Sequence, residues 1–191
     1  MLAFLALTFP AGAQTSLRDG DIVFHTSRSS QSAAIQRATH SPYSHMGMVF
    51  FRAGKPQVLE ASATVRYTPL AQWQARGNGG RFVVKRLKRA LDPAQVRKLR
   101  QAAEHLAGKP YDLYFEWSDD RIYCSELVWK AYHRALGVDI GERQRLRDFD
   151  LTDAAVKAKI QERYGTRVPL DEPVISPAAM FASPLLETVG E

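Results

Sequence analysis

The stretch Asp119–Gly137, DDRIYCSELVWKAYHRALG, contains the only cysteine among the 191 residues, Cys124. Apolar residues recur here at helical spacing and form one stripe: Cys124, Leu127, Val128, Ala131 and Ala135. This pattern predicts an amphipathic helix that ends near Gly137 and directs Cys124 inward from its first turn. Cys124 is then either a small apolar core residue or a nucleophile whose thiolate is stabilised by the free N–H groups of a helix N-terminus.

The segments around this helix predict the fold class. Four stretches rich in β-branched and aromatic residues indicate strands at 22–25, 44–51, 56–62 and 81–87. The sequence RAGK at 52–55 predicts a hairpin whose loop is Ala53-Gly54. Further helices are predicted at 29–40, 69–76, 92–106, 152–164 and 177–182. Because strands dominate the first half and helices the second, the sequence predicts an α+β fold with an antiparallel sheet.

Length and composition are those of an ordinary globular domain, with 45% hydrophobic and 24% charged residues. A single cysteine excludes an internal disulfide framework and a multi-cysteine zinc site. The net charge of +6 arises partly from KRLKR at 85–89 and RQRLR at 143–147. These clusters lack interleaved aromatics and any nucleic-acid module, so they indicate a solvated basic surface and no nucleic-acid partner. No apolar run approaches the roughly 18–20 residues of a membrane span, so no transmembrane segment is predicted.

The first 13 residues, MLAFLALTFPAGA, are apolar and uncharged and end in the small-x-small pattern of a signal-peptidase site. The usual Lys or Arg near the start is missing, as in a truncated signal peptide. We therefore expect residues 1–13 to be a leader and residues 14–191 to form one domain of a periplasmic or otherwise exported protein. The residue directly after the cleavage site is Gln14 and not a cysteine, so a lipoprotein is not predicted.

A thiol nucleophile needs a base, and His45 is the best-placed candidate. It lies at the start of the predicted strand 44–51, where a side chain can project from a sheet edge into a cleft. If Ala53-Gly54 is a two-residue loop, Glu60 lies opposite Gly47, on the His45 face and about 7–8 Å away at the backbone. Glycine leaves room for the carboxylate to reach the imidazole. A loop one residue longer would place Glu60 on the other face, so the geometry depends on the hairpin.

Several other residues are candidates for substrate or metal binding. The aromatic-rich segment GKPYDLYFEWSDDRIYC at 108–124 leads into Cys124, either as part of a substrate groove or as a hydrophobic strap that holds the helix. Its side chains Tyr111, Asp112 and Tyr123 are candidates for contact with substrate or with a developing oxyanion. His40 and His45 lack helical register and a third ligand, so neither a metal nor a cofactor is predicted. No G-x-S-x-G elbow surrounds any serine, which disfavours a serine hydrolase.

Three blocks together resemble a known family: GDIVFHTSRSSQSAAIQRATHSPYSHMGMVF at 20–50, VLEA at 58–61 and GKPYDLYFEWSDDRIYCSELVWKAY at 108–132. They are similar to the permuted papain-like hydrolases of the YiiX/YaeF type, within the NlpC superfamily, from about Leu17 to the C-terminus. In this permuted group the histidine strand precedes the cysteine helix, as His45 precedes Cys124 here. The resemblance implies a small antiparallel sheet or half-barrel packed on the cysteine helix. It also implies Cys124 as nucleophile, His45 as base and Glu60 as the residue that orients the base.

These observations predict a cysteine hydrolase that acts without a cofactor on an amide, in a small peptide, a peptidoglycan fragment or another acylated envelope compound. Two alternatives remain open. A thiol acyltransferase or lipid esterase on the same fold would have a long apolar tunnel beside Cys124. A non-catalytic envelope binding protein would have a Cys124 that alkylates no faster than a model thiol. The sequence indicates neither the physiological substrate nor the oligomeric state.

Overall fold

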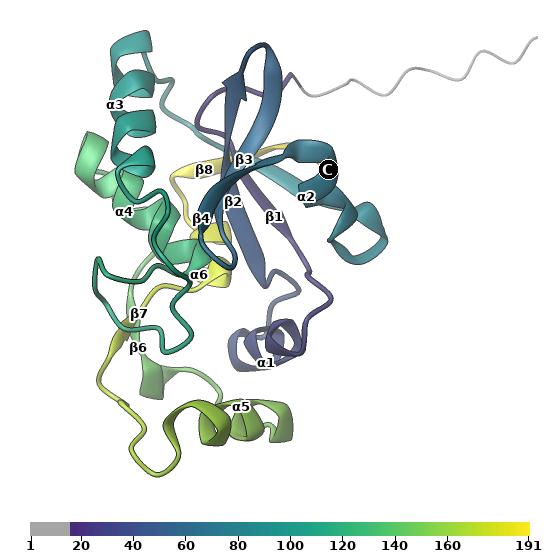
Figure 1. Ribbon diagram of the computed structural model, residues 1–191, viewed down its shortest axis with the longest axis vertical. Coiled ribbons are helices and arrows are strands. Elements are labelled where there is room, and N and C mark those ends of the chain that lie inside the picture. Colours follow the sequence, from purple (N-terminus) through teal and green to yellow (C-terminus); the bar gives the residue numbers. More distant parts are fainter. Residues whose placement is uncertain (1–15) are drawn as a thin grey trace, which may run out of the picture.

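A computed structural model of the chain describes residues 16–191, so the predicted leader at 1–13 lies outside the described residues (Figure 1). Its centre is a six-stranded sheet in the order β4-β3-β2-β1-β5-β8, in which all neighbouring strands are antiparallel. A separate two-stranded ribbon pairs β6 with β7. The strands are β1 (Ile22–His25), β2 (His45–Arg52), β3 (Lys55–Ala61), β4 (Val65–Pro69), β5 (Val83–Leu87), β6 (Gln144–Arg145), β7 (Pro173–Val174) and β8 (Leu186–Gly190).

Helices cover both faces of this sheet. Figure 1 shows α3 and α4 side by side on one face, α2 on the other, and α1 and α5 together at one end. The helices are α1 (Ser30–Thr39), α2 (Leu70–Ala75), α3 (Pro93–Glu104), α4 (Cys124–Leu136), α5 (Ala154–Tyr164) and α6 (Pro177–Phe181), with short 3₁₀ turns η1 (Asn78–Gly80) and η2 (Leu146–Asp148). The predicted α+β class with an antiparallel sheet is confirmed. Within residues 16–191, no helix has the length and apolar character needed to cross a membrane.

The hairpin between β2 and β3 forms with the predicted two-residue loop. Ala53 and Gly54 both have positive φ, 47° and 73°, as a type I′ turn requires, and Arg52 pairs with Lys55. The same register continues through Met48 opposite Leu59, which places the preceding pair, Gly47 and Glu60, opposite each other. The local turn chemistry therefore sets the register that brings the candidate base and carboxylate to one face of the sheet.

Strand alternation divides the apolar residues of the sheet between two cores. On one face, the side chains of β2 join α4 in the main core, which includes Met46, Met48, Phe50, Leu127 and Val128. On the other face, a smaller cluster lies under α2 and consists of Val23, Val49, Val58, Trp73 and Val84. The face that carries Val49 also carries His45 and Gly47, so the smaller core supports the site.

The fold differs from the sequence prediction in its short strands and in the burial of α4. Strands β4, β6, β7 and β8 were not predicted, because each is short and contributes few buried apolar residues. Helix α4 is also buried beyond its predicted stripe, since Trp129 and Lys130 are buried as well. Trp117, from the connecting segment before α4, packs edge-on against Trp129 with ring centroids 5.2 Å apart. The aromatic segment thus covers a second side of the cysteine helix.

Candidate active site

Cys124 is the first residue of α4 and is 3% exposed. The N–H groups of a first helical turn have no intrahelical partner, so the Cys124 amide is available to an anion. The helix start is fixed by Glu126, whose Oε2 accepts the N–H of Tyr123 at 3.2 Å, and by a 2.6 Å ion pair between Glu126 and Lys130. Gly137 ends the helix in the left-handed conformation, as predicted.

His45 lies between Cys124 and Glu60. Its Nε2 donates to Glu60 Oε2 at 2.6 Å, because an ionised carboxylate can only accept. The second neighbour that acts on the His45 imidazole is Cys124. Burial by itself would lower the pKa of His45, but the hydrogen bonds and negative charges of Cys124 and Glu60 outweigh it and raise this pKa to about 9. The surroundings of His45 therefore favour its imidazolium form.

Glu60 is held as a carboxylate although it is fully buried. Besides His45, it accepts a hydrogen bond from Thr68 Oγ1 at 2.6 Å and pairs with the guanidinium of Arg76. Burial would raise the pKa of Glu60, yet His45, Thr68 and Arg76 lower it to about 2. A Cβ on Gly47 would lie 2.5 Å from Val58 Cγ1, so only glycine fits beside this carboxylate. A side chain at position 47 would collide with its neighbours, which explains the glycine opposite Glu60.

A second buried histidine, His25, lies next to His45. His25 is 1% exposed and stacks on Trp73 with ring centroids 4.0 Å apart and an angle of 13° between the ring planes. Its ring lies 5.3 Å from that of His45. Burial, followed by the charge of His45, lowers the pKa of His25 to about 3. His25 is therefore neutral beside the imidazolium and adds no repulsive charge.

The hydroxyl of Tyr111, one of the predicted substrate-side residues, is held by polar side chains of α1 and α5. Gln31 of α1 donates from Nε2 to the Tyr111 hydroxyl at 2.8 Å, and Arg163 of α5 donates to Gln31 Oε1 at 2.9 Å. Burial, and then the negative charge of Cys124, raises the pKa of Tyr111. The hydroxyl therefore stays protonated and, while it accepts from Gln31, keeps its own proton free to donate.

The structure places the other two predicted residues differently. Tyr123 precedes α4, is buried, and its hydroxyl accepts the backbone N–H of Ile175 at 3.1 Å. Asp112 is fully buried and accepts the N–H of Tyr114 at 2.8 Å, which shapes the connecting segment. Tyr123 lines a cavity that also contains Cys124, whereas Asp112 is absent from the lining of both cavities described below. A direct role of Asp112 toward substrate stays a prediction.

Sequence reasoning did not identify four side chains that contact the site: Gln31, Thr68, Arg76 and Arg163. All four belong to other elements than the strand and helix that carry the predicted residues. No spacing in the sequence links Gln31 to Arg163, which is 132 positions away. Only the packing of α1 against α5 brings these two residues together.

Two cavities adjoin the site: one is lined by the candidate base and the other by the candidate nucleophile. The first, which we call the polar cleft, has a volume of about 830 Å³ and is lined by His45, Tyr111, five serines and two arginines. The second, which we call the apolar pocket, has a volume of about 100 Å³ and extends from Cys124 between α1 and α5. Gln31 and Ile35 of α1 line both, so α1 forms the wall between them.

Comparison with known proteins identifies relatives over nearly the whole chain. The chain is 51% identical over 191 residues to the uncharacterized protein YiiX of Escherichia coli strain K12, a match that covers 100% of this chain and 94% of that one. A crystal structure described as metalloprotein yiiX from Escherichia coli O157:H7 superposes with a TM-score of 0.89 at 55% identity. That match covers 91% of this chain and 97% of the other.

A family description, permuted papain-like amidase enzyme, YaeF/YiiX, C92 family, matches residues 16–190. The order of the site residues agrees with a permuted papain-like fold, since the histidine strand β2 precedes the cysteine helix α4. The predicted resemblance is confirmed, and so is the enzyme class of a papain-like cysteine amidase or peptidase. The chain belongs to the YaeF/YiiX family of permuted papain-like amidases.

Proposed function

We propose that this amidase uses Cys124, His45 and Glu60 as a catalytic triad to hydrolyse an amide of a cell-envelope peptide or related acyl compound. The observation that carries the proposal is the position of His45, whose Nε2 donates to the buried carboxylate of Glu60 at 2.6 Å and whose pKa is raised by both Cys124 and Glu60. A nucleophile next to a base that is oriented by a third group is the arrangement that covalent catalysis requires.

The proposed reaction has two steps. Cys124 Sγ attacks the amide carbonyl and forms a thioester, while the C–N bond breaks and the His45 imidazolium gives its proton to the leaving amine. Neutral His45 then takes a proton from water, whose oxygen attacks the thioester. The products are a carboxylic acid and the free enzyme, so one amide and one water give one acid and one amine. Glu60 acts by orienting His45 and stabilising its charged form.

The tetrahedral intermediate needs donors for its oxyanion, and two groups are suitably placed to serve. One is the Cys124 backbone N–H at the start of α4. The other is the Tyr111 hydroxyl, held by Gln31 at 2.8 Å. A Gln31→Leu substitution should lower kcat about tenfold with little change in KM, because it leaves Tyr111 in place but unoriented. Ala33→Leu, a substitution on the same helix outside both cavity linings, is the matched control.

The two alternatives predict different sites. A lipid esterase or acyltransferase would need an apolar tunnel beside Cys124, and the pocket that Cys124 lines is apolar. The His45 side opens instead into the polar cleft of about 830 Å³, which supports hydrolysis of peptide-like amides. A non-catalytic binding protein would have no use for a charged His45 beside the thiol, and the raised pKa of His45 argues for turnover.

The related crystal structure from Escherichia coli O157:H7 is of a protein described as a metalloprotein. Among residues 16–191 of this chain, no group of three or more His, Cys, Asp or Glu side chains is arranged to hold a metal ion. These residues do not fit a protein-ligated metal, and the proposed reaction contains no step through one.

We also propose that the protein acts in the cell envelope, on the basis of its apolar leader-like segment at 1–13. Expression of the whole chain followed by fractionation and mass spectrometry tests this. A periplasmic product that begins near Gln14 is expected, and a cytoplasmic product with an intact N-terminus would contradict the proposal.

The direct test of the triad is hydrolysis of a panel of N-acyl amino acids and dipeptides, measured as amine release. The native chain should hydrolyse at least one member, Cys124→Ala should hydrolyse none, and Cys124→Ala should retain the native unfolding midpoint within a few degrees. A Cys124→Ala variant as active as the native chain would refute the proposed nucleophile. Transfer of the acyl group to added hydroxylamine, in excess of hydrolysis, would instead support the acyltransferase alternative.

A further inference from the structure

We propose that the protein docks on a membrane through a cavity that is separate from the active site and holds the phosphate groups of anionic phospholipids. This cavity, which we call the arginine cavity, has a volume of about 600 Å³. It lies between residues 17–21, the end of β5 and the start of α3. None of Cys124, His45 and Glu60 lines it, so the inference goes beyond the proposed function.

Three arginines give this cavity an uncompensated positive charge. Its charged lining residues are Arg18, Asp19, Asp21, Arg86, Arg89 and Arg97. Asp21 accepts two hydrogen bonds from the guanidinium of Arg86, at 2.7 and 2.8 Å. Asp19 pairs at 2.8 Å with Arg100, which lies outside the lining. Both carboxylates are therefore already neutralised, whereas the other three arginines form no ion pair within residues 16–191.

The free guanidinium groups of Arg18, Arg89 and Arg97 match phosphate. All three side chains are exposed. A guanidinium presents its N–H donors in one plane and binds phosphate oxygens in pairs. Asp92, a carboxylate close to Arg89 in sequence, is not in the lining and caps α3 by accepting the N–H of Gln95 at 2.8 Å. A phosphate in the cavity therefore meets three positive charges and no unpaired carboxylate among the lining residues.

An exposed aromatic side chain in the same lining favours a membrane over a soluble phosphate compound. Phe51 lines the cavity from β2 and is 36% exposed, and Leu17 and Leu91 also line it. Proteins that lie on a bilayer combine basic side chains on the anionic headgroups with aromatic or leucine side chains that enter the interfacial layer. A soluble phosphate compound would pair with the arginines and leave Phe51 in water. The bilayer surface is the partner that uses both.

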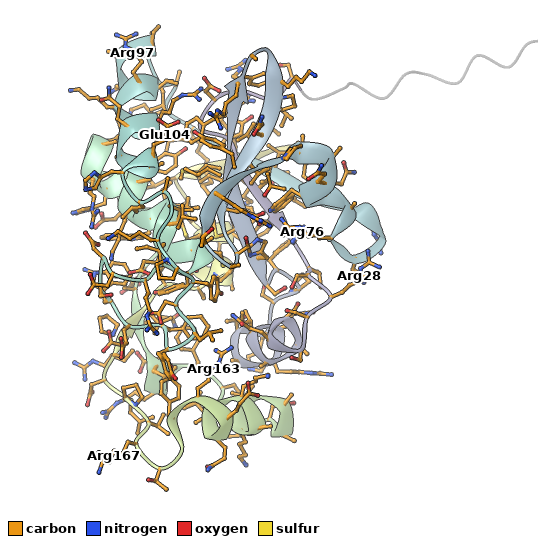
Figure 2. All side chains as sticks on the ribbon, viewed as in Figure 1. Arg28, Arg76, Arg97, Glu104, Arg163 and Arg167 are labelled. Atoms are coloured by element: carbon orange, nitrogen blue, oxygen red, sulfur yellow. The ribbon has the colours of Figure 1, made fainter. Side chains whose placement is uncertain are left out.

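The position of the cavity suits this contact. Leu17 and Arg18 closely follow the apolar segment 1–13, which is predicted to enter a membrane as a leader. Figure 2 shows Arg97 at the opposite end of the molecule from Arg167, with Arg28 and Arg76 of the polar cleft between them. A bilayer at the Arg97 end therefore leaves the polar cleft clear of the contact.

The test is sedimentation of the whole chain with vesicles, which measures binding without any substrate. One set of vesicles contains phosphatidylglycerol and phosphatidylcholine in equal amounts, and the other contains phosphatidylcholine alone. An anionic surface strengthens binding about fivefold for each nearby arginine, so three arginines should favour the anionic vesicles about 100-fold. Raising the salt from about 0.05 M to about 0.5 M should remove most of this preference. Segment 1–13 carries no charged side chain, so its contribution is nearly the same for both kinds of vesicle.

Two matched triple variants assign the preference to the arginine cavity. Replacing Arg18, Arg89 and Arg97 by Gln should bring the ratio of anionic to neutral binding to within about threefold of unity. The control removes the same charge from three exposed arginines outside the lining: Arg66, Arg81 and Arg167. The control should keep the native ratio within about threefold. Both variants should retain the native unfolding midpoint, because all six side chains are exposed.

A single substitution tests the apolar part of the contact. Phe51→Ser should weaken binding to the anionic vesicles about fivefold, because the apolar area that leaves water is lost. Leu170→Ser, at a residue that is 41% exposed and lies outside the arginine cavity, is the matched control and should bind as the native chain does. Neither residue belongs to the two apolar cores, so both variants should fold.

Several outcomes would overturn the membrane contact. Equal binding to both kinds of vesicle would do so, and so would an equal loss of preference in the two triple variants. Displacement from the anionic vesicles by glycerol phosphate, at an ionic strength matched with sodium chloride, would assign the cavity to a soluble phosphate compound instead. Equally tight binding to a DNA oligonucleotide, lost in the arginine-cavity variant, would assign it to nucleic acid. Cys124 alkylation and amine release test the triad separately, so none of these results bears on the proposed function.

Discussion

The pH dependence of Cys124 alkylation tests the central contact of the site. Since Cys124 is the only cysteine in the chain, incorporation of iodoacetamide reports on this residue alone. The perturbation is His45→Ala, which removes the imidazole that hydrogen-bonds to the thiol. The matched control is His105→Ala, an exposed histidine at the C-terminal end of α3.

The expected magnitude follows from the charge state of His45. The pKa of His45 is raised to about 9, so its imidazolium persists through pH 8. A positive charge next to a thiol favours the reactive thiolate. The alkylation rate of the native chain should then change less than about twofold between about pH 6 and pH 8. An ordinary thiol with a pKa of about 8.5 goes from about 0.3% to about 24% thiolate over the same range. The rate for His45→Ala should therefore rise roughly 80-fold.

The shape of this profile is informative although Cys124 is nearly buried. Restricted access scales every rate by one factor and leaves the dependence on pH unchanged, and so does the lower intrinsic reactivity of a stabilised thiolate. His105→Ala should reproduce the flat native profile. If the native chain and His45→Ala both rise by about two orders of magnitude over this pH range, the ion pair does not exist and the catalytic argument fails.

Three further predictions concern the residues around this pair. Glu60→Gln should lower kcat about 100-fold with a small change in KM, because His45 loses the negative charge that stabilises its protonated form. An unchanged kcat would show that Glu60 is not part of the triad. Gly47→Ala should lower the free energy of unfolding by about 1–3 kcal/mol in urea titrations, since its Cβ would lie 2.5 Å from Val58 Cγ1; native stability would contradict this steric argument. The pKa of His25 is lowered from 6.5 to about 3, so protonation below pH 6.5 favours the unfolded chain. The free energy of unfolding of the native chain should therefore fall by about 2 kcal/mol through this group between about pH 7.5 and pH 5, and that of His25→Phe should not. Equal losses in urea unfolding would count against a buried neutral His25.

Much of the site followed from local sequence. Glycine in the second loop position and the strand patterns on either side predicted the β2–β3 hairpin, and this register placed Glu60 on the His45 face. The apolar spacing after Cys124 predicted α4, its inward-facing thiol and its end at Gly137. These features depend on residues near one another in the chain, where turn chemistry and side-chain periodicity act directly.

The partners of Glu60 and the two cavities did not follow from the sequence. Thr68 belongs to a strand too short to be predicted, and Arg76 reaches Glu60 only because α2 folds back over the sheet. The pair of Gln31 and Arg163 exists because α1 packs on α5. Hydrogen bonds between distant elements produce no periodic pattern in the sequence. Each partner is a single polar residue, and the residues next to it in the chain do not make the same contact.

By itself, the sequence determined the α+β class, the positions of the cysteine helix and the histidine strand, and the membership of a permuted papain-like family that is now confirmed. Tertiary structure alone decided the surroundings of the site: an apolar pocket between α1 and α5 beside Cys124, and a polar cleft with two arginines beside His45. The physical reason is that secondary structure is set by local preference, whereas the shape and charge of a cavity are set by which surfaces of distant elements are left unfilled when the core packs.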